Sequence, residues 1–291
     1  MEDKIICNDE YYLNLKNGTQ IKTRELQLEV LSIMDEVHRV CMKNNIPYCL
    51  IAGSALGIVN YKGFIPWDDD MDMAIMRKDW DRFVKAMEKD LGDQFYFHCY
   101  ENNKKYNILI PSMKVRKKGT YIEEVNFLLK NRCPGDGIFL DVVIYDYMAD
   151  SVLVDEIFRC MNRILMLPMV LLDNLHIQPY LLKKLVLFIS EKYAKCNEGS
   201  SRISQTIAIP WEKFLKEPIF PAEDVLPFSP YEFEGRTFYS YHNIENVCHK
   251  WWGPNCTKKW NGKEWEETLP VEKRHSKHSA NLNLHGDTEA E

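Results

Sequence analysis

The stretch that decides the fold is IAGSALGIVNYKGFIPWDDDMDMAIM, residues 51–76. An apolar run over residues 48–52, YCLIA, predicts a short buried strand. Gly53 and Ser54 end that run. Glycine lets the backbone approach a ligand closely, and the Ser54 hydroxyl beside free backbone N–H groups favours phosphate binding. A short helix is expected over residues 55–60.

The second half of this stretch carries four aspartates within five positions: Asp68, Asp69, Asp70 and Asp72. If the segment is a strand, the first, third and fourth of them share one face, and the apolar residues between them point into a core. Two carboxylates about 4 Å apart repel by about 4 kcal/mol at an effective dielectric constant of about 20. The cluster therefore needs a cation or bound protons, and oxygen-only ligands favour Mg²⁺ or Mn²⁺.

Three other interpretations of this stretch fit less well. A solvated acidic loop fits poorly, because apolar residues 65–67 and 71–75 flank the aspartates. A calcium-binding loop shares the Asp-x-Asp-x-Asp spacing but needs Gly and Glu where this chain has Met73 and Asp79. A membrane-helix contact through Gly53 and Gly57 would need an apolar segment of about 20 residues around it.

A further carboxylate lies in the apolar run IFLDVVI, residues 138–144. A lone carboxylate such as Asp141 in so apolar a strand is costly unless it is paired or bound to metal. We predict that Asp141 is a third metal ligand, and the alternative is a structural aspartate held by backbone N–H groups. Asp136 and Asp146, at the ends of the run, are weaker candidates.

Lys114 and Arg116 are candidates for contact with a phosphate. They share one face of a strand expected over residues 112–116, and a second strand is expected over 120–124. Residues 117–119, Lys-Lys-Gly, predict a hairpin between the two strands. The alternative is that both side chains are ordinary exposed cations.

Helical periodicity predicts amphipathic helices over residues 23–44 and 80–91, with a strand over 95–100. Two more helices are expected, one over 154–165 that Pro168 interrupts and one over 181–193 that carries several lysines. This pair is predicted to be a lobe packed on the sheet, and the alternative is a basic surface in peripheral contact with a membrane. No segment offers the roughly 18 uninterrupted apolar residues of a membrane span.

Composition limits the classes of function. A net charge of −6 over 291 residues argues against a general nucleic-acid binder, which needs surplus Lys and Arg. Nine cysteines without a C-x-x-C pair, and a first segment without a basic-then-apolar pattern, predict a cytoplasmic protein without a signal peptide. The spacing of Cys248, His249 and Cys256 fits no common zinc finger.

Gly-Ser, a spacer and Asp-hydrophobic-Asp on a strand resemble the nucleotidyltransferase fold. The longer string GSALGIVNYKGFIPWDDDMDMAI resembles the LicD family, phosphocholine transferases related to the fukutin proteins. The likeness extends over roughly residues 24–275 and includes a strand lysine at Lys114 and a Phe-hydrophobic-Asp run at Asp141. It departs at residues 251–255, Trp-Trp-Gly-Pro-Asn, where the family usually shows Tyr-Gly-Asp.

The resemblance implies an α/β architecture with a nucleotidyltransferase-like mixed sheet. The expected transferase domain spans residues 24–274, with a core over 24–150, a helical insertion over 151–200 and an irregular C-terminal region over 201–274. A polar segment precedes this domain, over residues 1–23. Residues 275–291 are expected to form a disordered tail.

It also implies a metal-dependent phosphotransferase. A CDP-linked alcohol, with CDP-choline as first choice, would donate its phospho-alcohol to a sugar hydroxyl of a glycan or glycolipid such as teichoic acid or lipopolysaccharide, releasing CMP. The expected catalytic residues are Asp68, Asp70, Asp72 and Asp141, of which the last three bind Mg²⁺ or Mn²⁺. The expected substrate-binding residues are Gly53, Ser54, Trp67 and Lys114.

Two other functions are kept as alternatives. One is a nucleotidyltransferase that attaches the nucleotide half and releases pyrophosphate. The other is an inactive module that binds nucleotide or glycan. The expected location is the cytoplasm, including the inner face of the membrane.

Overall fold

The computed structural model describes residues 11–14, 20–103, 112–124, 137–175, 177–205, 219–257 and 279–284. The helices are α1 (Thr23–Lys43), α2 (Ala52–Tyr61), α3 (Arg77–Asp90), α4 (Val152–Asn174), α5 (Tyr180–Cys196), α6 (Ala222–Val225) and α7 (Ile244–Trp252). The first strands are β1 (Tyr12–Asn14), β2 (Gln20–Lys22), β3 (Cys49–Leu50), β4 (Asp72–Met76), β5 (Phe95–Cys99), β6 (Ser112–Lys117) and β7 (Tyr121–Glu124). The others are β8 (Phe139–Met148), β9 (Arg202–Gln205), β10 (Phe220–Pro221), β11 (Ser229–Phe233), β12 (Arg236–Ser240) and β13 (Ser279–Asn283).

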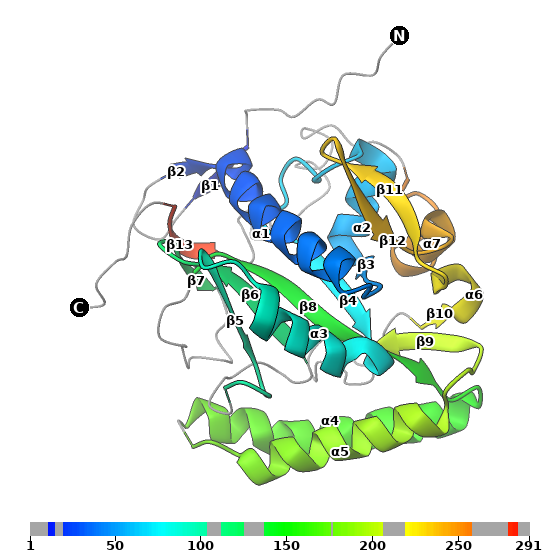
Figure 1. The fold of residues 1–291 in the computed structure, drawn as a ribbon. Coiled ribbons are helices and arrows are strands. Elements are labelled where there is room, and N and C mark those ends of the chain that lie inside the picture. The colour runs from blue at the N-terminus through cyan, green and yellow to red at the C-terminus, as the bar shows by residue number, and fades with distance from the viewer. Residues whose placement is uncertain are drawn as a thin grey trace.

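A mixed sheet forms the centre of the molecule, which confirms the predicted α/β class (Figure 1). Along its main path the strand order is β10-β9-β8-β4-β3-β12-β11. β8 is the longest strand. Its first half pairs antiparallel with β6 and its second half antiparallel with β9, while β4 runs parallel along its other side. The parallel register places Asp72 opposite Asp141.

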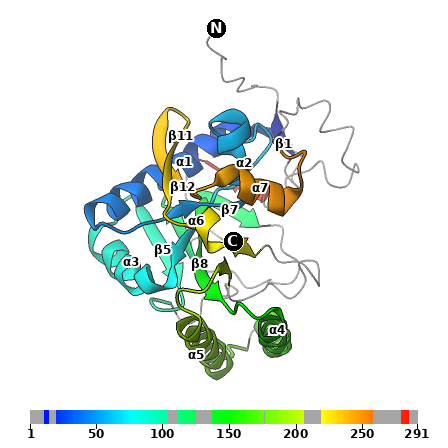
Figure 2. The same ribbon diagram turned by 90° about the vertical axis from the view of Figure 1, so that its right-hand side faces the viewer.

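Helices cover the sheet on both sides: α1 and α3 lie on one face, and α2 and α7 lie on the other (Figures 1 and 2). As a result Met73, Ala74 and Ile75 of β4 are all fully buried. The expectation that β4 alternates between a carboxylate face and a core face is therefore wrong. Asp72, at the first position of β4, is partly exposed, but the other four residues of the strand are buried between two helical layers.

Several local predictions are confirmed. The predicted helices over residues 23–44, 80–91 and 181–193 correspond to α1, α3 and α5. The strand over 95–100 corresponds to β5, and the run over 138–144 lies in β8. None of the described helices combines the length and the apolar character needed to cross a membrane.

Two local predictions are wrong, one about a strand pairing and one about the end of a helix. β6 and β7 were expected to pair across residues 117–119, but β6 pairs with β5 and β8, and β7 pairs with β13. The Lys117 N–H donates to the carbonyl of Ile138, which keeps the end of β6 beside β8. In α4, Pro168 does not end the helix, because the fully buried Met166 and Met169 hold the turns on either side of it.

The C-terminal region is more regular than the sequence predicts. Glu234 and Gly235 both have positive φ, 52° and 71°, which suits the tight turn of the β11–β12 hairpin. Ser240 of β12 pairs in parallel with Leu50 of β3, so this hairpin extends the main sheet. Within the predicted disordered tail, residues 279–283 form β13. Residues 275–278 and 285–291 lie outside the described part, as does Asp136.

A buried ion pair joins the second half of β8 to the start of α3. Asp146 is 1% exposed, and Arg77 donates through Nε and Nη2 to its two carboxylate oxygens, each at 2.6 Å. Burial raises the pKa of Asp146, and the Arg77 guanidinium acts in the opposite direction. Asp146 is therefore accounted for as a structural residue.

Arg77→Met should destabilise the protein by about 3 kcal/mol near neutral pH, because a buried carboxylate loses its partner. Without Arg77 the pKa of Asp146 rises further, and below that pKa the carboxyl group is protonated and neutral. The loss should therefore shrink as the pH falls towards about 4. Melting temperatures of both proteins across this range test the prediction. Lys195→Met, which breaks an exposed pair, is the control and should change stability by less than about 0.5 kcal/mol. If the stability difference between Arg77→Met and the wild type stays constant or grows as the pH falls, the prediction is wrong.

Candidate metal centre and active site

Three aspartates meet in the loop that precedes β4. One oxygen atom from each of Asp68, Asp69 and Asp70 can be chosen so that all three lie within 4.8 Å of one another. The sequence predicted that Asp68 and Asp70 lie on a strand, but both are in this loop, and only Asp72 belongs to β4. Asp69 is the buried member of the group, at 6% exposure.

The electrostatics of the loop favour a cation. The pKa of Asp68 is raised well above its usual range, first by burial of the carboxyl group and then by the charges of Asp70, Asp69 and Asp72. A hydrogen bond between the carboxyl groups of Asp68 and Asp70 adds to the shift, and such a bond requires a shared proton. A divalent cation would satisfy the same oxygens with all of them ionised, and three oxygen donors suit Mg²⁺ or Mn²⁺. Elsewhere among the described residues Cys248, His249 and Cys256 form no comparable group.

Gly53 leaves room for the Asp68 carboxylate where the loop meets α2. A Cβ atom at this position would lie 2.7 Å from Oδ2 of Asp68, so a larger residue would force that carboxylate to move. Gly53 and Ser54 lie in the first turn of α2, which begins three residues earlier than the predicted helix. The preceding residue, Ala52, has a left-handed φ of 49°, which turns the chain from β3 into this helix.

Ser54 is tied to the same acidic segment. Its hydroxyl oxygen accepts a hydrogen bond of 3.0 Å from the backbone N–H of Asp72, and its side chain is buried. In the structure both Gly53 and Ser54 therefore position aspartates. Their contact with a phosphate remains a prediction.

Asp72, Asp141 and Lys114 form a row across three neighbouring strands. The registers place Asp141 opposite Asp72 of β4 on one side and opposite Lys114 of β6 on the other. Lys114 Nζ lies 2.8 Å and 3.0 Å from the two carboxylate oxygens of Asp141. It also lies 3.3 Å from the centre of the Phe139 ring.

Asp141 has an ion-pair partner in this row. A carboxylate in so apolar a strand needs a partner, and Lys114 is that partner. The cost of an isolated charge therefore no longer argues for metal at Asp141. Its place beside Asp72 still makes it a candidate ligand, and Lys114 remains a candidate phosphate contact. Arg116, on the same strand, donates instead to the carbonyl of Gly137, 2.7 Å away.

Trp67 directly precedes the aspartates and belongs to an aromatic group. Its ring centroid lies 5.6 Å from that of Tyr11 and 6.2 Å from that of Tyr61. Aromatic faces attract quaternary ammonium groups. The role of Trp67 in substrate binding remains a prediction.

Sequence reasoning missed Gln27, which organises the loop from α1. The side chain is 1% exposed, and its Nε2 donates to the carbonyls of Ile65 at 3.1 Å and Asp68 at 2.9 Å. A third contact reaches the carbonyl of Pro66 at 3.4 Å. The available signal was a polar residue at a core-facing position of an amphipathic helix. Gln27 thus holds the backbone that presents the aspartates.

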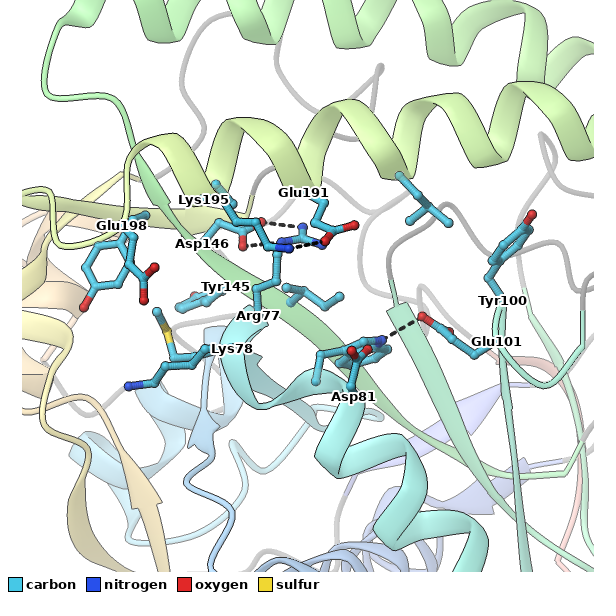
Figure 3. Close-up of a pocket in the computed structure, with 16 residues that line it drawn as sticks. Arg77, Lys78, Asp81, Tyr100, Glu101, Tyr145, Asp146, Glu191, Lys195 and Glu198 are labelled. Carbon is cyan, nitrogen blue, oxygen red and sulfur yellow. Dashed lines mark hydrogen bonds and ion pairs between the residues drawn. The ribbon is translucent and has the colours of Figure 1, made fainter.

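A cavity of about 450 Å³ lies at the opposite end of β4 and β8, against α5 (Figure 3). Asp72 and Met76 mark the two ends of β4, so the cavity lies about 13 Å from the aspartates along this strand. Several of its polar groups are paired with one another. The Arg77–Asp146 pair lines it, Lys195 bonds Glu191 at 2.6 Å, and Trp80 donates to Glu101 at 2.8 Å. It is separate from the candidate metal centre.

Residues 45–146 match the family model described as LicD/FKTN/FKRP, nucleotidyltransferase domain. The resemblance to the LicD family is confirmed over this segment. All the aspartates of the candidate centre lie within it, together with Gly53, Ser54, Trp67 and Lys114. The α4–α5 helices and the β11–β12 hairpin lie outside the LicD segment.

Three curated relatives align with parts of the chain. The lipopolysaccharide cholinephosphotransferase LicD of Haemophilus influenzae is 35% identical over 83 residues, which are 28% of this chain and 31% of that protein. An uncharacterised protein of Rickettsia prowazekii is 31% identical over 150 residues, 48% of this chain and 54% of its own. A second, from Rickettsia typhi, is 39% identical over 107 residues, 33% of this chain and 35% of its own. The chain thus spans between about a third and a half of the length of these relatives.

Asp70→Asn and Asp72→Asn should each lower turnover by at least about 100-fold, because metal-ion catalysis contributes several kcal/mol. Metal-free stability should hold or rise slightly, because one repelling charge is removed. Melting curves with and without Mg²⁺ give an independent measurement: Mg²⁺ should stabilise the wild type and have little effect on the variants. The exposed Asp93→Asn is the matched control. A variant that keeps more than half of the wild-type activity has not lost a metal ligand.

Gln27→Leu should lower stability by about 1–3 kcal/mol, because buried carbonyls lose their donor. If Gln27 positions the loop, Mg²⁺ affinity measured by calorimetry should fall as well, although Gln27 is not a ligand. Ser32→Ala, which removes a side-chain hydrogen bond on the same helix, should leave that affinity unchanged. Lower stability with full Mg²⁺ affinity would restrict Gln27 to a structural role.

Proposed function

We propose that this chain is a metal-dependent phosphotransferase that transfers a phospho-alcohol from a CDP-linked donor to a sugar hydroxyl of a cell-surface glycan. Phosphocholine is the first candidate for the group transferred, and teichoic acid and lipopolysaccharide are candidate acceptors. The observation that carries the proposal is the cluster of three carboxylates, Asp68, Asp69 and Asp70, within the segment that matches the LicD family model. The name of the Haemophilus influenzae relative supports choline phosphate as the candidate transferred group and lipopolysaccharide as a candidate acceptor.

In the proposed reaction, the acceptor oxygen attacks the phosphorus that carries the alcohol. The bond from this phosphorus to the bridging oxygen breaks, and CMP leaves with that oxygen. A bound Mg²⁺ would supply charge neutralisation at the diphosphate. Asp70, Asp72 and Asp141 are the proposed ligands, and Asp68 is either a further ligand or the base that accepts the hydroxyl proton.

The remaining residues of the centre have proposed roles in binding. Lys114, which pairs with Asp141, would contact a phosphate oxygen from the strand beside the aspartates. Backbone N–H groups in the first turn of α2, at Gly53 and Ser54, offer further contacts to phosphate. The aromatic group at Trp67 is the proposed contact for the alcohol, where a choline ammonium would lie against ring faces.

We place this activity in the cytoplasm, at or near a membrane that holds the acceptor. The described cysteines are free thiols, and the chain lacks C-x-x-C pairs, as is typical of a reducing compartment.

The test is to supply the purified chain with Mg²⁺, a panel of CDP-alcohols and nucleoside triphosphates, and a teichoic-acid or lipopolysaccharide-type acceptor. CMP should form with at least one CDP-alcohol, and only with metal present. The rate of CMP formation should exceed the rate of donor hydrolysis only when acceptor is present. Asp70→Asn and chelation are the negative controls, and Asp93→Asn is the positive one.

Two outcomes would replace this proposal. Release of pyrophosphate from a nucleoside triphosphate, without CMP from any CDP-alcohol, would assign the chain as a nucleotidyltransferase. Binding of a CDP-alcohol without any metal-dependent product would assign it as an inactive binding module.

A further inference from the structure

Helices α4 and α5 form an antiparallel hairpin that lies along one end of the molecule, apart from the helices on the sheet (Figures 1 and 2). A small apolar cluster packs within it, with Met166, Met169 and Val186 as its buried members. The sequence predicted that the apolar faces of this pair would pack on the sheet. Most of the large apolar side chains are instead exposed.

The hairpin buries polar side chains and exposes apolar ones. Five polar or charged side chains of the hairpin are at most 2% exposed: Asp155, Arg159, Asn162, Lys183 and Ser190. Asp155 is a centre of this interior, because it pairs with Arg159 and Arg202 and accepts a hydrogen bond from Tyr193. An amphipathic helix pair normally turns its apolar face inward, but the interior of this hairpin contains these five polar side chains as well as the small apolar cluster.

The exposed apolar side chains form one stripe on each helix. On α4, Leu153, Ile157, Ile164 and Leu171 follow one another at spacings of four and seven residues, and each is at least 61% exposed. On α5, Leu181 at 85%, Leu185 at 45% and Phe188 at 54% continue the pattern. These spacings place each set on one helical face, away from the buried polar residues.

No comparable surface exists elsewhere in the described chain. The exposed large apolar side chains outside the hairpin and its connecting turn are Tyr12, Leu28, Met42 and Trp252, which are distributed over β1, α1 and α7. Isolated exposed apolar residues are normal, but a continuous apolar surface marks a site of contact with a partner or a membrane.

Lysines border the stripe on α5. Lys184 and Lys192 are exposed, and Lys192 Nζ lies 5.5 Å from the centre of the Phe188 ring, whereas the exposed Lys195 is paired with Glu191. Lysine side chains bordering an apolar face are typical of helices that lie in a membrane interface, where the stem packs on apolar groups and the ammonium reaches the headgroups. In a chain with a net charge of −6, these local cations are the groups that complement an anionic surface.

We propose that the α4–α5 hairpin docks this protein on an anionic lipid bilayer, with the apolar stripes in the headgroup region and the lysines against lipid phosphates. A second copy of the chain is the alternative occupant, and the light-scattering measurement below distinguishes it. The proposal does not depend on the proposed function, and the hairpin lies outside the LicD segment.

The test is sedimentation of the full chain with vesicles of phosphatidylcholine alone and of phosphatidylcholine mixed with phosphatidylglycerol. The wild type should bind the mixed vesicles more tightly. The double variant Ile164→Gln, Leu181→Gln should bind both at least about tenfold more weakly, since burial of one large apolar side chain contributes more than a tenfold step. Because both positions are exposed, its melting temperature should not change.

Two controls separate the contributions. Leu28→Gln removes an exposed leucine of α1 and should bind vesicles like the wild type. Lys184→Gln with Lys192→Gln should weaken binding to the anionic vesicles by about tenfold and leave binding to neutral vesicles nearly unchanged.

Absence of vesicle binding by the wild type would overturn the proposal, and so would equal binding by the Ile164→Gln, Leu181→Gln variant. Light scattering of the same proteins gives the alternative outcome. A wild-type dimer that this variant dissociates, without vesicle binding, would make the stripes an interface between copies. None of these measurements uses a donor or an acceptor, so failure of the proposed reaction would not affect them.

Discussion

Repulsion among Asp68, Asp69 and Asp70 is the constraint on which the rest of the candidate centre depends. Three carboxylates within 4.8 Å are stable together only with a shared proton or a cation, and only if the chain cannot move them apart. Gln27 fixes the loop backbone from α1, Gly53 leaves room for the Asp68 carboxylate, and Ser54 holds the neighbouring N–H of Asp72. The surrounding structure therefore keeps a repelling arrangement in place, as is typical of functional rather than stabilising charges.

The second charged row, through Asp72, Asp141 and Lys114, differs from the loop in kind. Here one of the two carboxylates is neutralised, since Lys114 contacts both oxygens of Asp141. The centre thus combines an acidic loop with an ion pair on adjacent strands. A phosphate-bearing ligand that bridges the two would meet a metal ion on one side and a lysine on the other, which is the usual setting for stabilising charge on a transferred phosphoryl group.

Local patterns predicted the helices α1, α3 and α5 and the apolar strand β8, because periodicity and run length depend only on neighbouring residues. The strand pairings were harder. Residues 117–119 look like a hairpin turn, but the partners of β6 and β7 are distant strands whose register no local pattern reveals. The β11–β12 hairpin was missed although Glu234-Gly235 is a turn signal, because its place beside β3 depends on tertiary contact.

The candidate residues show the same division. The sequence identified the aspartates, since so dense a cluster is informative by itself, but it placed Asp68 and Asp70 on the wrong element. It could not identify Gln27, because the side chain acts through hydrogen bonds to two carbonyls about 40 positions later in the chain. It also assigned the apolar faces of α4 and α5 to the core, because periodicity shows that a face is apolar but not what covers it.

Asp141 lies near the beginning of β8, and α4 follows the end of that strand. The length of β8 therefore affects how far the carboxylates lie from the hairpin. From Asp141 to Met148 the strand extends for up to about 23 Å. If the hairpin rests on a bilayer as we propose, up to this length of strand separates the carboxylates from the end of β8 that leads into the hairpin. Under the proposed function, a hydroxyl several residues along a surface glycan would reach the aspartates more readily than a sugar attached directly to a lipid. The sheet would then act as a spacer that selects acceptors by their length.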